Sequence, residues 1–376
     1  MNTWIEKHAE EQLELLKTLA AIPAPSHDEG RRVEFLLNWL KGIGINHAYA
    51  DEAKNVIVPF AAPDAEGLTI YTAHTDVVFP DVTPLPVAQE GDILKAPGVG
   101  DDTANVVGIL MTLKYIKEHG LVPKDPVIFV LNSCEEGLGN LKGIRQVMKD
   151  FGPRTKEHIS FDGPYNFGMI AQAVGSERWR VSVKTVGGHS YAAFGNPNAI
   201  VELSQLIVKL STQEVPKKEG VHTTFNVGTI SGGTSVNTIA QNAEMLYEYR
   251  SNDREHLEQM RRQFMDALES VKSERAEFSL ECVGERPCGG EIDKDALARL
   301  HARAEAAMRE VLGPEGEIMK RPGSTDSNIP LSLGIPSVTF GLYVGGGEHT
   351  REEWLEIPTL AKGLKIAFKM VLEHFE

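Results

Sequence analysis

The sequence predicts an α/β protein with a mixed, largely parallel sheet flanked by helices and an inserted α+β domain with an antiparallel sheet. Three observations predict this architecture. Short apolar strands alternate with helices between Leu68 and Phe161, a pattern typical of βαβ units. From about Glu177 the apolar residues instead alternate one by one with polar residues, as in an antiparallel sheet with one wet face. After Gly289-Gly290 the first pattern returns.

Two helices are expected at the N-terminus. The first runs from Trp4 to Ala20 and ends before Pro23 and Pro25, because proline removes a helical hydrogen bond. Ser26-His-Asp-Glu29 has the spacing of a capping box and predicts the start of the second helix. Apolar side chains recur there at helical spacing, at Val33, Leu36, Leu37 and Leu40. Gly42 then marks its end.

Alternating strands and helices follow. Strands are predicted at Leu68–Ala73, Pro126–Asn132 and Ile159–Phe161. Helices are predicted between them at Thr103–Glu118 and Gly139–Lys149. Parallel strands need such helical crossovers, so we expect a parallel sheet.

The inserted segment has a different pattern. Alternating apolar residues predict two of its strands, with Trp179, Val181 and Val183 in one and Ala243, Met245, Tyr247 and Tyr249 in the other. Helices at 199–210 and 254–271 would cover the apolar face. A helix at 293–311, a strand at 337–340 and a helix at 358–375 resume the first pattern. The prediction is a discontinuous domain of residues 1–175 and 286–376, interrupted by a domain of residues 176–285.

Composition excludes several classes of protein. The chain has 38 Lys plus Arg against 53 Asp plus Glu, a net charge of −15, which disfavours binding to nucleic acid or to anionic membranes. The N-terminus lacks the apolar core of a signal peptide, and no apolar stretch approaches the ~20 residues of a membrane span. Three cysteines without a Cys-x-x-Cys motif favour a reducing, cytoplasmic location.

Histidines and carboxylates follow the predicted strands. His74-Thr-Asp76, Glu135-Glu136 and Asp162 each follow one strand, and His349 follows the strand at 337–340 through a glycine-rich turn. Asp101-Asp102 precedes a helix at the same edge. Ligands bind at the carboxyl edge of such sheets, and mixed nitrogen and oxygen ligands suit Zn, Co or Mn. One bridging Asp could hold two metals ~3.5–4 Å apart.

Each of these residues alone also fits a structural interpretation, since an isolated strand-end His or Asp is commonly a hydrogen-bonded structural residue and Glu135-Glu136 fits a solvated loop. Their convergence favours a metal site. Gly98-Val-Gly100 fails as a dinucleotide motif because Thr103 replaces the third glycine. Cys134 is interpreted as a buried structural residue because the sequence indicates no basic partner for it.

These residues together resemble the M20 metallopeptidase family. The resemblance covers nearly the whole chain and is closest to the peptidase T branch. The motifs that carry it are His74-Thr-Asp76, Gly100-Asp101-Asp102, Glu135-Glu136, Asp162, Gly187-Gly-His189-Ser190, Gly232-Gly-Thr-Ser-Val-Asn237, Tyr249-Arg250-Ser251, Gly323-Ser-Thr-Asp326-Ser-Asn328 and His349-Thr-Arg-Glu-Glu353-Trp354. The resemblance implies a metal-binding catalytic domain and an inserted lid or dimerisation domain.

The resemblance implies specific roles. Two divalent metals, most simply Zn with Co or Mn as alternatives, would be held by His74, Asp101, Glu136, Asp162 and His349, with Asp101 as the bridge. Asp76 would orient His74, Glu135 would act as general base, and His189 of a neighbouring subunit would stabilise the oxyanion. Substrate contacts are implied for Asn237, Arg250, Gly323, Ser324 and Thr325. An interpretation of Arg250 as a surface arginine at a strand edge remains open.

We therefore expect a homodimeric hydrolase of amide bonds in small peptides, specifically an aminopeptidase acting on di- or tripeptides. An N-acyl amino acid deacylase is the alternative, and a catalytically silent metal-binding scaffold is the third hypothesis. Three departures from the family pattern leave the substrate open. They are Thr103, Asn105 and the bulky segment Tyr191-Ala-Ala-Phe194.

Overall fold

The computed structural model describes residues 1–314 and 316–376, which form two compact units. The first unit joins Met1–Ala173 to Gly290–Glu376, and the second unit is Val174–Gly289. Each unit has its own hydrophobic core, as expected of independently packed domains.

Among the described residues, an eight-stranded mixed sheet forms the centre of the first unit, in the order β1-β2-β6-β3-β7-β16-β8-β15. The strands are β1 (Tyr49–Ala50), β2 (Val56–Phe60), β3 (Leu68–His74), β6 (Val127–Asn132), β7 (Thr155–Phe161), β8 (Met169–Ala173), β15 (Lys320–Gly323) and β16 (Ser337–Phe340). Strands β6, β3, β7 and β16 run parallel, as do β8 and β15, whereas β1–β2, β2–β6 and β16–β8 are antiparallel pairs. The predicted fold class is therefore confirmed.

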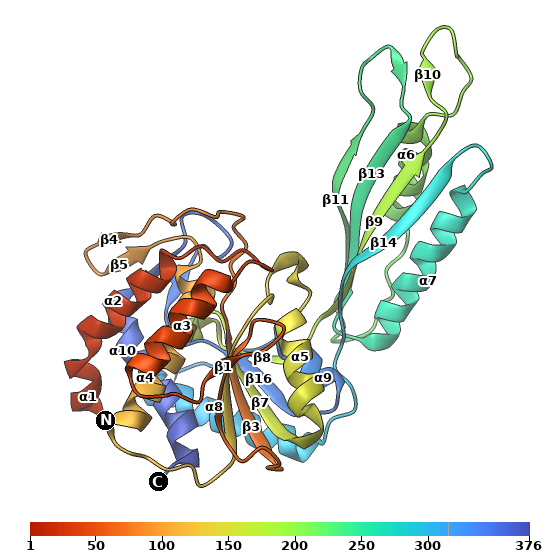
Figure 1. Ribbon diagram of the computed structural model, residues 1–376. Coiled ribbons are helices and arrows are strands. Elements are labelled where there is room, and N and C mark those ends of the chain that lie inside the picture. Colours follow the sequence, from red (N-terminus) through yellow and green to blue (C-terminus); the bar gives the residue numbers. More distant parts are fainter. Residues whose placement is uncertain (315) are drawn as a thin grey trace. The chain divides into compact units, whose positions relative to one another are not determined.

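Helices cover both faces of this sheet (Figure 1). One layer contains α1 (Asn2–Lys7), α2 (Ala9–Ala20), α3 (Gly30–Gly42), α4 (Asn105–Glu118), α8 (Lys294–Leu312) and α10 (Ile357–Val371). The other contains α5 (Lys142–Phe151) and α9 (Asn328–Ser332). Tyr71 and Phe129 pack toward the first layer, whereas Ile70 and Ile128 pack toward the second. Because both faces are covered, every residue of β3, β6 and β16 is buried, and β6 is an almost continuous apolar run.

A small antiparallel sheet in the first unit joins two distant segments. It has the order β17-β18-β5-β4. Its strands are β4 (Ala88–Glu90), β5 (Ile93–Lys95), β17 (Gly345–Gly346) and β18 (Trp354–Glu356). Short helical turns elsewhere lie at Val99–Ala104, Gly137–Gly139, Gly152–Arg154, Tyr165–Phe167 and Leu372–His374.

The second unit is built on an antiparallel sheet in the order β11-β13-β9-β14. Its strands are β9 (Gly175–Lys184), β11 (Thr223–Gly232), β13 (Asn242–Ser251) and β14 (Glu277–Arg286). Helices α6 (Ala199–Ser211) and α7 (Arg254–Val271) cover one face (Figure 1). Strands β10 (Gly188–His189) and β12 (Thr238–Ile239) form a separate two-stranded ladder.

Two predicted helices differ from the structure for local reasons. The first predicted helix is two helices, α1 and α2, that meet at His8, whose Nδ1 lies 2.8 Å from the carbonyl oxygen of Trp4. The predicted helix at Gly139 begins instead at Lys142, because Asn140 and Leu141 have left-handed φ angles of 54° and 59°.

The predicted capping box at Ser26 is also wrong. Helix α3 begins at Gly30 after Glu29, which makes no side-chain cap. The Ser26 hydroxyl instead donates to Asp76 Oδ2 at 2.6 Å and to the Glu136 carbonyl oxygen at 3.2 Å. Both acceptors are distant in sequence, so the capping pattern could not reveal them. A hydroxyl that donates to an ionised carboxylate makes a charge-assisted hydrogen bond, which is stronger than a neutral one.

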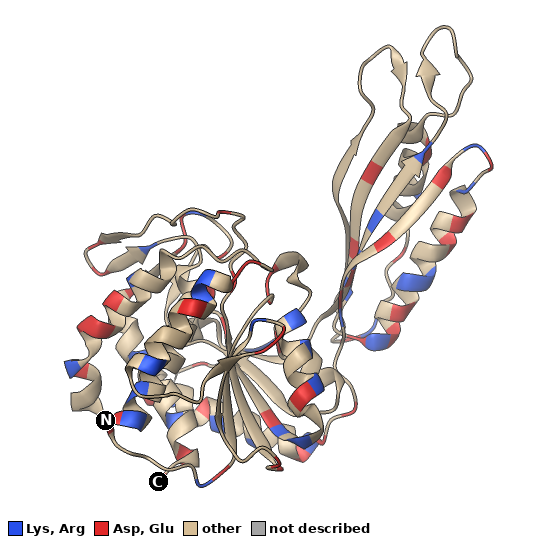
Figure 2. Cartoon of the chain, viewed as in Figure 1, with Lys and Arg blue, Asp and Glu red and all other residues tan. Residues whose placement is uncertain are grey.

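The surface carries mixed charge. Figure 2 shows Lys and Arg interspersed with Asp and Glu along the helices of both units. Among the described residues, no helix combines the length and the hydropathy needed to cross a bilayer.

Candidate metal centre

The parallel strands of the first unit bring the predicted ligands to one edge. His74 is the last residue of β3, Glu135 and Glu136 follow β6, and Asp162 follows β7. Strand β3 lies between the other two, so the three strand ends are neighbours. His349 lies between β17 and β18.

Ligand atoms of these residues form three overlapping groups, in each of which all atoms lie within 4.8 Å of one another. The groups are His74-Asp101-Asp102-Asp162, His74-Glu135-Glu136 and Asp101-Glu136-His349. The structure therefore brings together all five residues that the sequence proposes as metal ligands, and Glu135 with them.

Asp101 divides its two carboxylate oxygens between the histidines. Its Oδ1 lies 3.0 Å from His74 Nε2, and its Oδ2 lies 3.2 Å from His349 Nε2. The same His349 nitrogen lies 3.0 Å from Glu136 Oε1. One carboxylate thus links two groups of donors.

The site concentrates negative charge in a buried place. Burial raises the pKa of Asp162 well above its ordinary value, and the nearby Asp101 carboxylate adds to the shift. Burial and Asp101 also raise the pKa of Glu136, to about 7. Hydrogen bonds to Asp101 and Glu136 raise the pKa of His349 to about 11. Carboxylates outnumber imidazoles, so the groups attract positive charge.

This donor set fits divalent metal ions. Imidazole nitrogen with carboxylate oxygen is a ligand combination typical of Zn, Co and Mn. Cations at the two groups that Asp101 links would neutralise buried carboxylates whose pKa values are otherwise raised, as those of Asp162 and Glu136 are. His74, Asp101 and Asp162 would hold one ion, and Asp101, Glu136 and His349 the other.

Asp76 anchors the turn that carries the two glutamates. Its Oδ1 accepts the backbone N–H of Glu135 at 2.9 Å, and its Oδ2 accepts that of Glu136 at 3.0 Å. The expected contact to His74 is less direct, since His74 Nδ1 lies 3.1 Å from the Asp76 carbonyl oxygen and 3.5 Å from Oδ1. Asp76 therefore positions the glutamates as well as lying beside the imidazole.

The departures from the family pattern near Asp102 have structural roles. Asp102 Oδ2 accepts the backbone N–H of His74 at 2.8 Å. Asn105 donates to Asp102 Oδ1 and accepts the backbone N–H of Leu342 at 2.7 Å. Thr103 accepts from Arg32 Nη1 at 3.1 Å. Thr103 and Asn105 therefore support the backbone beside the candidate ligands.

Some neighbours of the centre were not assigned a role from sequence. Arg32 is fully buried and donates from Nη1 to the Thr75 carbonyl oxygen at 2.9 Å. Burial lowers its pKa to about 10, while Asp76 and Glu353 favour its charged form. Asp326 is also buried and accepts from Asn132 Nδ2 at 2.7 Å. Neither the contact of Arg32 nor that of Asp326 could be found from local sequence motifs, because each joins segments far apart in the chain.

Cys134 precedes the glutamates and is buried, as expected for a structural thiol. Contrary to expectation, a basic residue is adjacent, because His27 Nδ1 lies 3.4 Å from its sulfur. The thiol also donates to Glu29 Oε1 at 3.1 Å. Burial and Glu29 raise the pKa of Cys134 to about 12, so it is held as a thiol rather than as a nucleophilic thiolate.

Three predicted functional residues lie in the second unit. His189 Nδ1 accepts the backbone N–H groups of Tyr191 and Ala192 at 3.2 and 3.4 Å, which places the ring proton of a neutral imidazole on Nε2. Asn237 lies close to His189, because its backbone carbonyl oxygen accepts the Ser190 N–H at 2.9 Å. Local hydrogen bonds to backbone groups thus orient the His189 ring and hold the segment that carries it.

Arg250 lies on β13, between β11 and β9. It is therefore not at a sheet edge, and the interpretation as a strand-edge residue is wrong. Its Nε and Nη2 donate to Glu248 at 3.0 Å each. The guanidinium is thus already oriented by a bidentate carboxylate contact.

The predicted loop Gly323-Ser324-Thr325 follows β15 in the first unit. Gly323 ends that strand, and Thr325 is buried, with its N–H donating to Asn328 Oδ1 at 2.9 Å. The hydrogen bond between Thr325 and Asn328 therefore holds the end of this loop in a turn.

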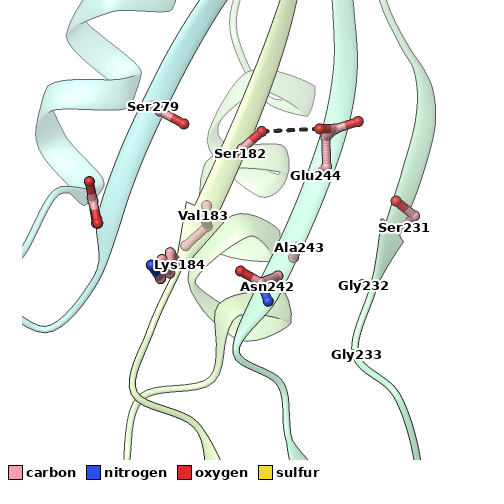
Figure 3. Close-up of a pocket in the computed structure, with 11 residues that line it drawn as sticks. Ser182, Val183, Lys184, Ser231, Gly232, Gly233, Asn242, Ala243, Glu244 and Ser279 are labelled. Atoms are coloured by element: carbon pink, nitrogen blue, oxygen red, sulfur yellow. Dashed lines mark hydrogen bonds between the residues drawn. The ribbon is translucent and has the colours of Figure 1, made fainter.

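A hollow of about 610 Å³ lies on the open face of the second unit's sheet (Figure 3). Ser182 there donates to Glu244 at 3.1 Å. None of its lining residues is a predicted site residue, and the side chains are mostly small or singly charged. They are Ser182, Val183, Lys184, Ser231, Gly232, Gly233, Asn242, Ala243, Glu244, Glu277 and Ser279.

Relatives of this chain have low sequence identity to it, but the similarity extends over most of both chains. Protein YqjE of Bacillus subtilis is 25% identical over 335 residues, covering 85% of each chain. The succinyl-diaminopimelate desuccinylase of a Bradyrhizobium species is 24% identical and covers 81% of this chain and 82% of its own.

Solved structures share the fold. A tripeptidase of Staphylococcus aureus has a TM-score of 0.75 at 22% identity, over 97% of this chain and 99% of its own. Aminopeptidase PepT of Bacillus cereus has a TM-score of 0.73 at 19% identity, over 97% and 98%. YxeP of Bacillus subtilis, described as a dinuclear metal-binding peptidase, has a TM-score of 0.58 at 18% identity, over 98% and 99%.

A comparison of the sequence with models of protein families identifies the family. The sequence model of peptidase family M20/M25/M40 matches residues 70–373. That range includes every candidate ligand, both glutamates and the whole second unit. With the two donor groups that share Asp101, this match shows that the chain belongs to peptidase family M20/M25/M40.

Proposed function

We propose that this hydrolase cleaves amide bonds in small peptides, as an aminopeptidase on di- or tripeptides, with two divalent metal ions. The observation that carries the proposal is the division of the Asp101 carboxylate between His74 and His349, at 3.0 and 3.2 Å. Zinc is the metal that we propose first, with Co or Mn as substitutes.

Bound at these residues, the ions would supply Lewis acidity for the scissile carbonyl and lower the pKa of the attacking water. Glu135 lies in the group with His74 and Glu136. It would take one proton from the water as the new C–O bond forms, and would deliver a proton to the amine as the C–N bond breaks. General-base catalysis of this kind contributes ~10²–10⁴ in rate.

The second unit would supply the substrate contacts. With its ring proton on Nε2, His189 has a donor for the developing oxyanion. We propose that Asn237 and Arg250 bind the substrate backbone or carboxylate. Glu248 already accepts from Nε and Nη2 of Arg250, so Nη1 would donate to the substrate. We propose the same role for the loop Gly323-Ser324-Thr325 of the first unit.

We further propose that two copies of the chain associate through their second units. More of the exposed large hydrophobic residues in the described structure lie in the second unit than in the longer first unit. They include Val201 and Val208 on α6 and Ile230 on β11, which are 51%, 62% and 54% exposed. This larger number of exposed apolar residues supports an interaction surface on the second unit. The cysteines are free thiols, which suits the cytoplasmic location that we propose.

The alternative is an N-acyl amino acid deacylase. It is supported by the relative described as a succinyl-diaminopimelate desuccinylase, which covers most of this chain. The two reactions share an amide and a neighbouring free carboxylate, so the same metal residues serve both. They differ in whether the substrate's α-amine is free or acylated.

The test compares substrates on one preparation. Protein stripped with a chelator and reloaded with Zn, Co or Mn is assayed on trialanine, N-acetyl-trialanine and N-acetyl-alanine. Hydrolysis of trialanine alone supports the aminopeptidase, whereas hydrolysis of the acetylated compounds alone supports the deacylase. Full activity in the stripped protein would contradict the metal-dependent mechanism, and inactivity of the loaded protein on all amides would support the silent scaffold.

A further inference from the structure

Glu353 is a buried carboxylate that binds the loop carrying Asp101. Its side chain is 1% exposed. Oε1 accepts the backbone N–H groups of Gly100 and Asp101, and Oε2 accepts that of Gly98, each at 2.8 Å. Three backbone N–H groups of one loop thus converge on the two oxygens of a single carboxyl group. The loop that presents Asp101 is therefore bound to a single side chain.

The backbone brings Glu353 to this position through the small sheet. Strand β18 begins one residue after Glu353, and Trp354 pairs with Lys95 of β5. The ladder continues one step further, because the Ala96 N–H donates to the Glu353 carbonyl oxygen at 3.2 Å. Residues after β5 and residues before β18 are thus held side by side.

The loop is shaped to present its N–H groups. Gly98 has a φ angle of 69°, and a Cβ atom there would lie 2.3 Å from Val77 Cγ1. A Cβ atom at Gly100 would lie 2.5 Å from the Tyr343 ring. Side chains at either position would force the loop away, so the two glycines allow three N–H groups to converge on one carboxylate.

Glu353 also belongs to the segment that carries His349, four residues before it. The Gly347 carbonyl accepts the Thr350 N–H at 3.0 Å, and the Thr350 carbonyl accepts the Glu353 N–H at 3.4 Å. His349 lies inside the first of these two turns, and Glu353 closes the second, which begins at Thr350. The Glu353 side chain meanwhile binds the loop of Asp101. The two residues meet at 3.2 Å, between His349 Nε2 and Asp101 Oδ2.

We propose that Glu353 is a positioning residue that sets the distance between Asp101 and His349 and so prepares the site for two metal ions. The inference rests on the proposed metal-dependent function but assigns a role to a residue outside the ligand set. Glu353 touches neither substrate nor metal and acts through the backbone of Asp101 and the turn of His349.

The chain offers a matched control, because Glu352 is the adjacent residue and is exposed. In Glu353→Gln the amide has one oxygen for three N–H donors, so at least one donor faces an NH₂ group. Glu352→Gln makes the same chemical change without touching the loop. Both variants and the unsubstituted protein are stripped of metal, checked by near-ultraviolet circular dichroism, and titrated with Zn²⁺ against a chromogenic chelator. Cobalt-loaded samples report ligand geometry through their visible absorption.

We expect Glu353→Gln to weaken zinc binding roughly 10-fold or more, as loss of residues that orient ligands does. Its cobalt spectrum should change while its near-ultraviolet spectrum is kept. Glu352→Gln should match the unsubstituted protein in both. If folded Glu353→Gln binds two ions as tightly as the unsubstituted protein and with the same cobalt spectrum, the positioning role is overturned. If the unsubstituted protein itself binds fewer than two ions, the proposed function fails first.

Hydrogen exchange on the unsubstituted, metal-free protein tests the proposal even if Glu353→Gln does not fold. We expect slow exchange at the amides of Gly98, Gly100 and Asp101, because each donates to Glu353. Rapid exchange at all three would show that the carboxylate does not hold the loop in solution and would overturn the proposal.

Discussion

The carboxylate of Asp76 accepts the backbone N–H of Glu135 at 2.9 Å, and with its other oxygen it accepts the N–H of Glu136 at 3.0 Å. The proposed general base and a proposed metal ligand therefore share one anchor. The anchor lies two residues after His74, so a single strand end organises three of the proposed functional side chains.

Replacing Asp76 by Asn should lower turnover. The amide has one acceptor where the carboxylate has two, so one of the two glutamate N–H groups loses its partner. We expect kcat/KM to fall roughly 10–100-fold, as for other residues that support a metal site. Ser26→Ala removes only the donor at 2.6 Å from Oδ2 and should have a smaller effect. Steady-state kinetics of both variants check this order, and a larger loss in Ser26→Ala would contradict it.

Substitutions of the two adjacent glutamates, Glu135 and Glu136, should affect metal content and turnover differently. Glu135→Gln keeps the size of the side chain but cannot take a proton, so we expect both metals to remain and turnover to fall by ~10²–10⁴. Glu136→Gln removes an anionic ligand and should lower metal content first, with activity falling as a consequence. Metal analysis beside turnover distinguishes them. Loss of metal in Glu135→Gln alone would reverse the two roles, and full activity of both variants would refute the mechanism.

Mixed dimers should restore activity if His189 acts in the partner's site. His189→Ala and Glu135→Ala are each expected to be inactive. After subunit exchange, random pairing gives one intact site per mixed dimer and about one quarter of the unsubstituted activity. Native mass spectrometry confirms that exchange has occurred. Exchange without recovered activity would contradict action across the dimer.

His158 should make the protein less stable in acid. It is fully buried, with Nε2 3.0 Å from Thr72 Oγ1 and Nδ1 2.7 Å from Ser337 Oγ, and burial lowers its pKa to about 3. The unfolded chain, with an ordinary pKa of about 6.5, binds the proton first. Stability is therefore complete above pH 6.5 and falls as the pH drops toward 3, by about 2 kcal/mol at pH 5.

Urea unfolding between pH 7.5 and 5 measures this loss. His158→Gln is destabilised at every pH by altered packing, so the relevant quantity is the slope of unfolding free energy against pH. The slope should be shallower in the variant, because glutamine does not titrate. Equal slopes in the two proteins would show that His158 does not contribute.

Sequence patterns revealed those parts of the fold that depend on neighbours along the chain. Apolar runs and helical spacing predicted the central strands and most helices, and the change to period-two alternation predicted the antiparallel sheet. In each case the burial of one face sets the period of apolar residues. Strand β2 went unnoticed, because Pro59 within it obscures the pattern.

Candidate ligands could be recognised in sequence because parallel strands end at one edge, so residues that follow each strand become neighbours. The detailed contacts could not be recognised. Ser26 has the spacing of a helix cap, yet its hydroxyl binds Asp76, 50 residues away. Glu353 binds the loop of Asp101 across 252 residues.

The sequence by itself determined the fold class and the membership of the M20 family, together with the chemical types available at the sheet edge. Tertiary structure decided which oxygen of Asp101 faces which histidine, and which buried carboxylates serve as anchors rather than candidate ligands. The physical reason is that a local pattern records burial, which repeats along the chain, whereas a hydrogen bond between distant segments depends on where two loops meet after folding. Asp76 and Glu353 are carboxylates like Asp101 and Glu136, but each accepts backbone N–H groups of a loop that carries candidate functional residues.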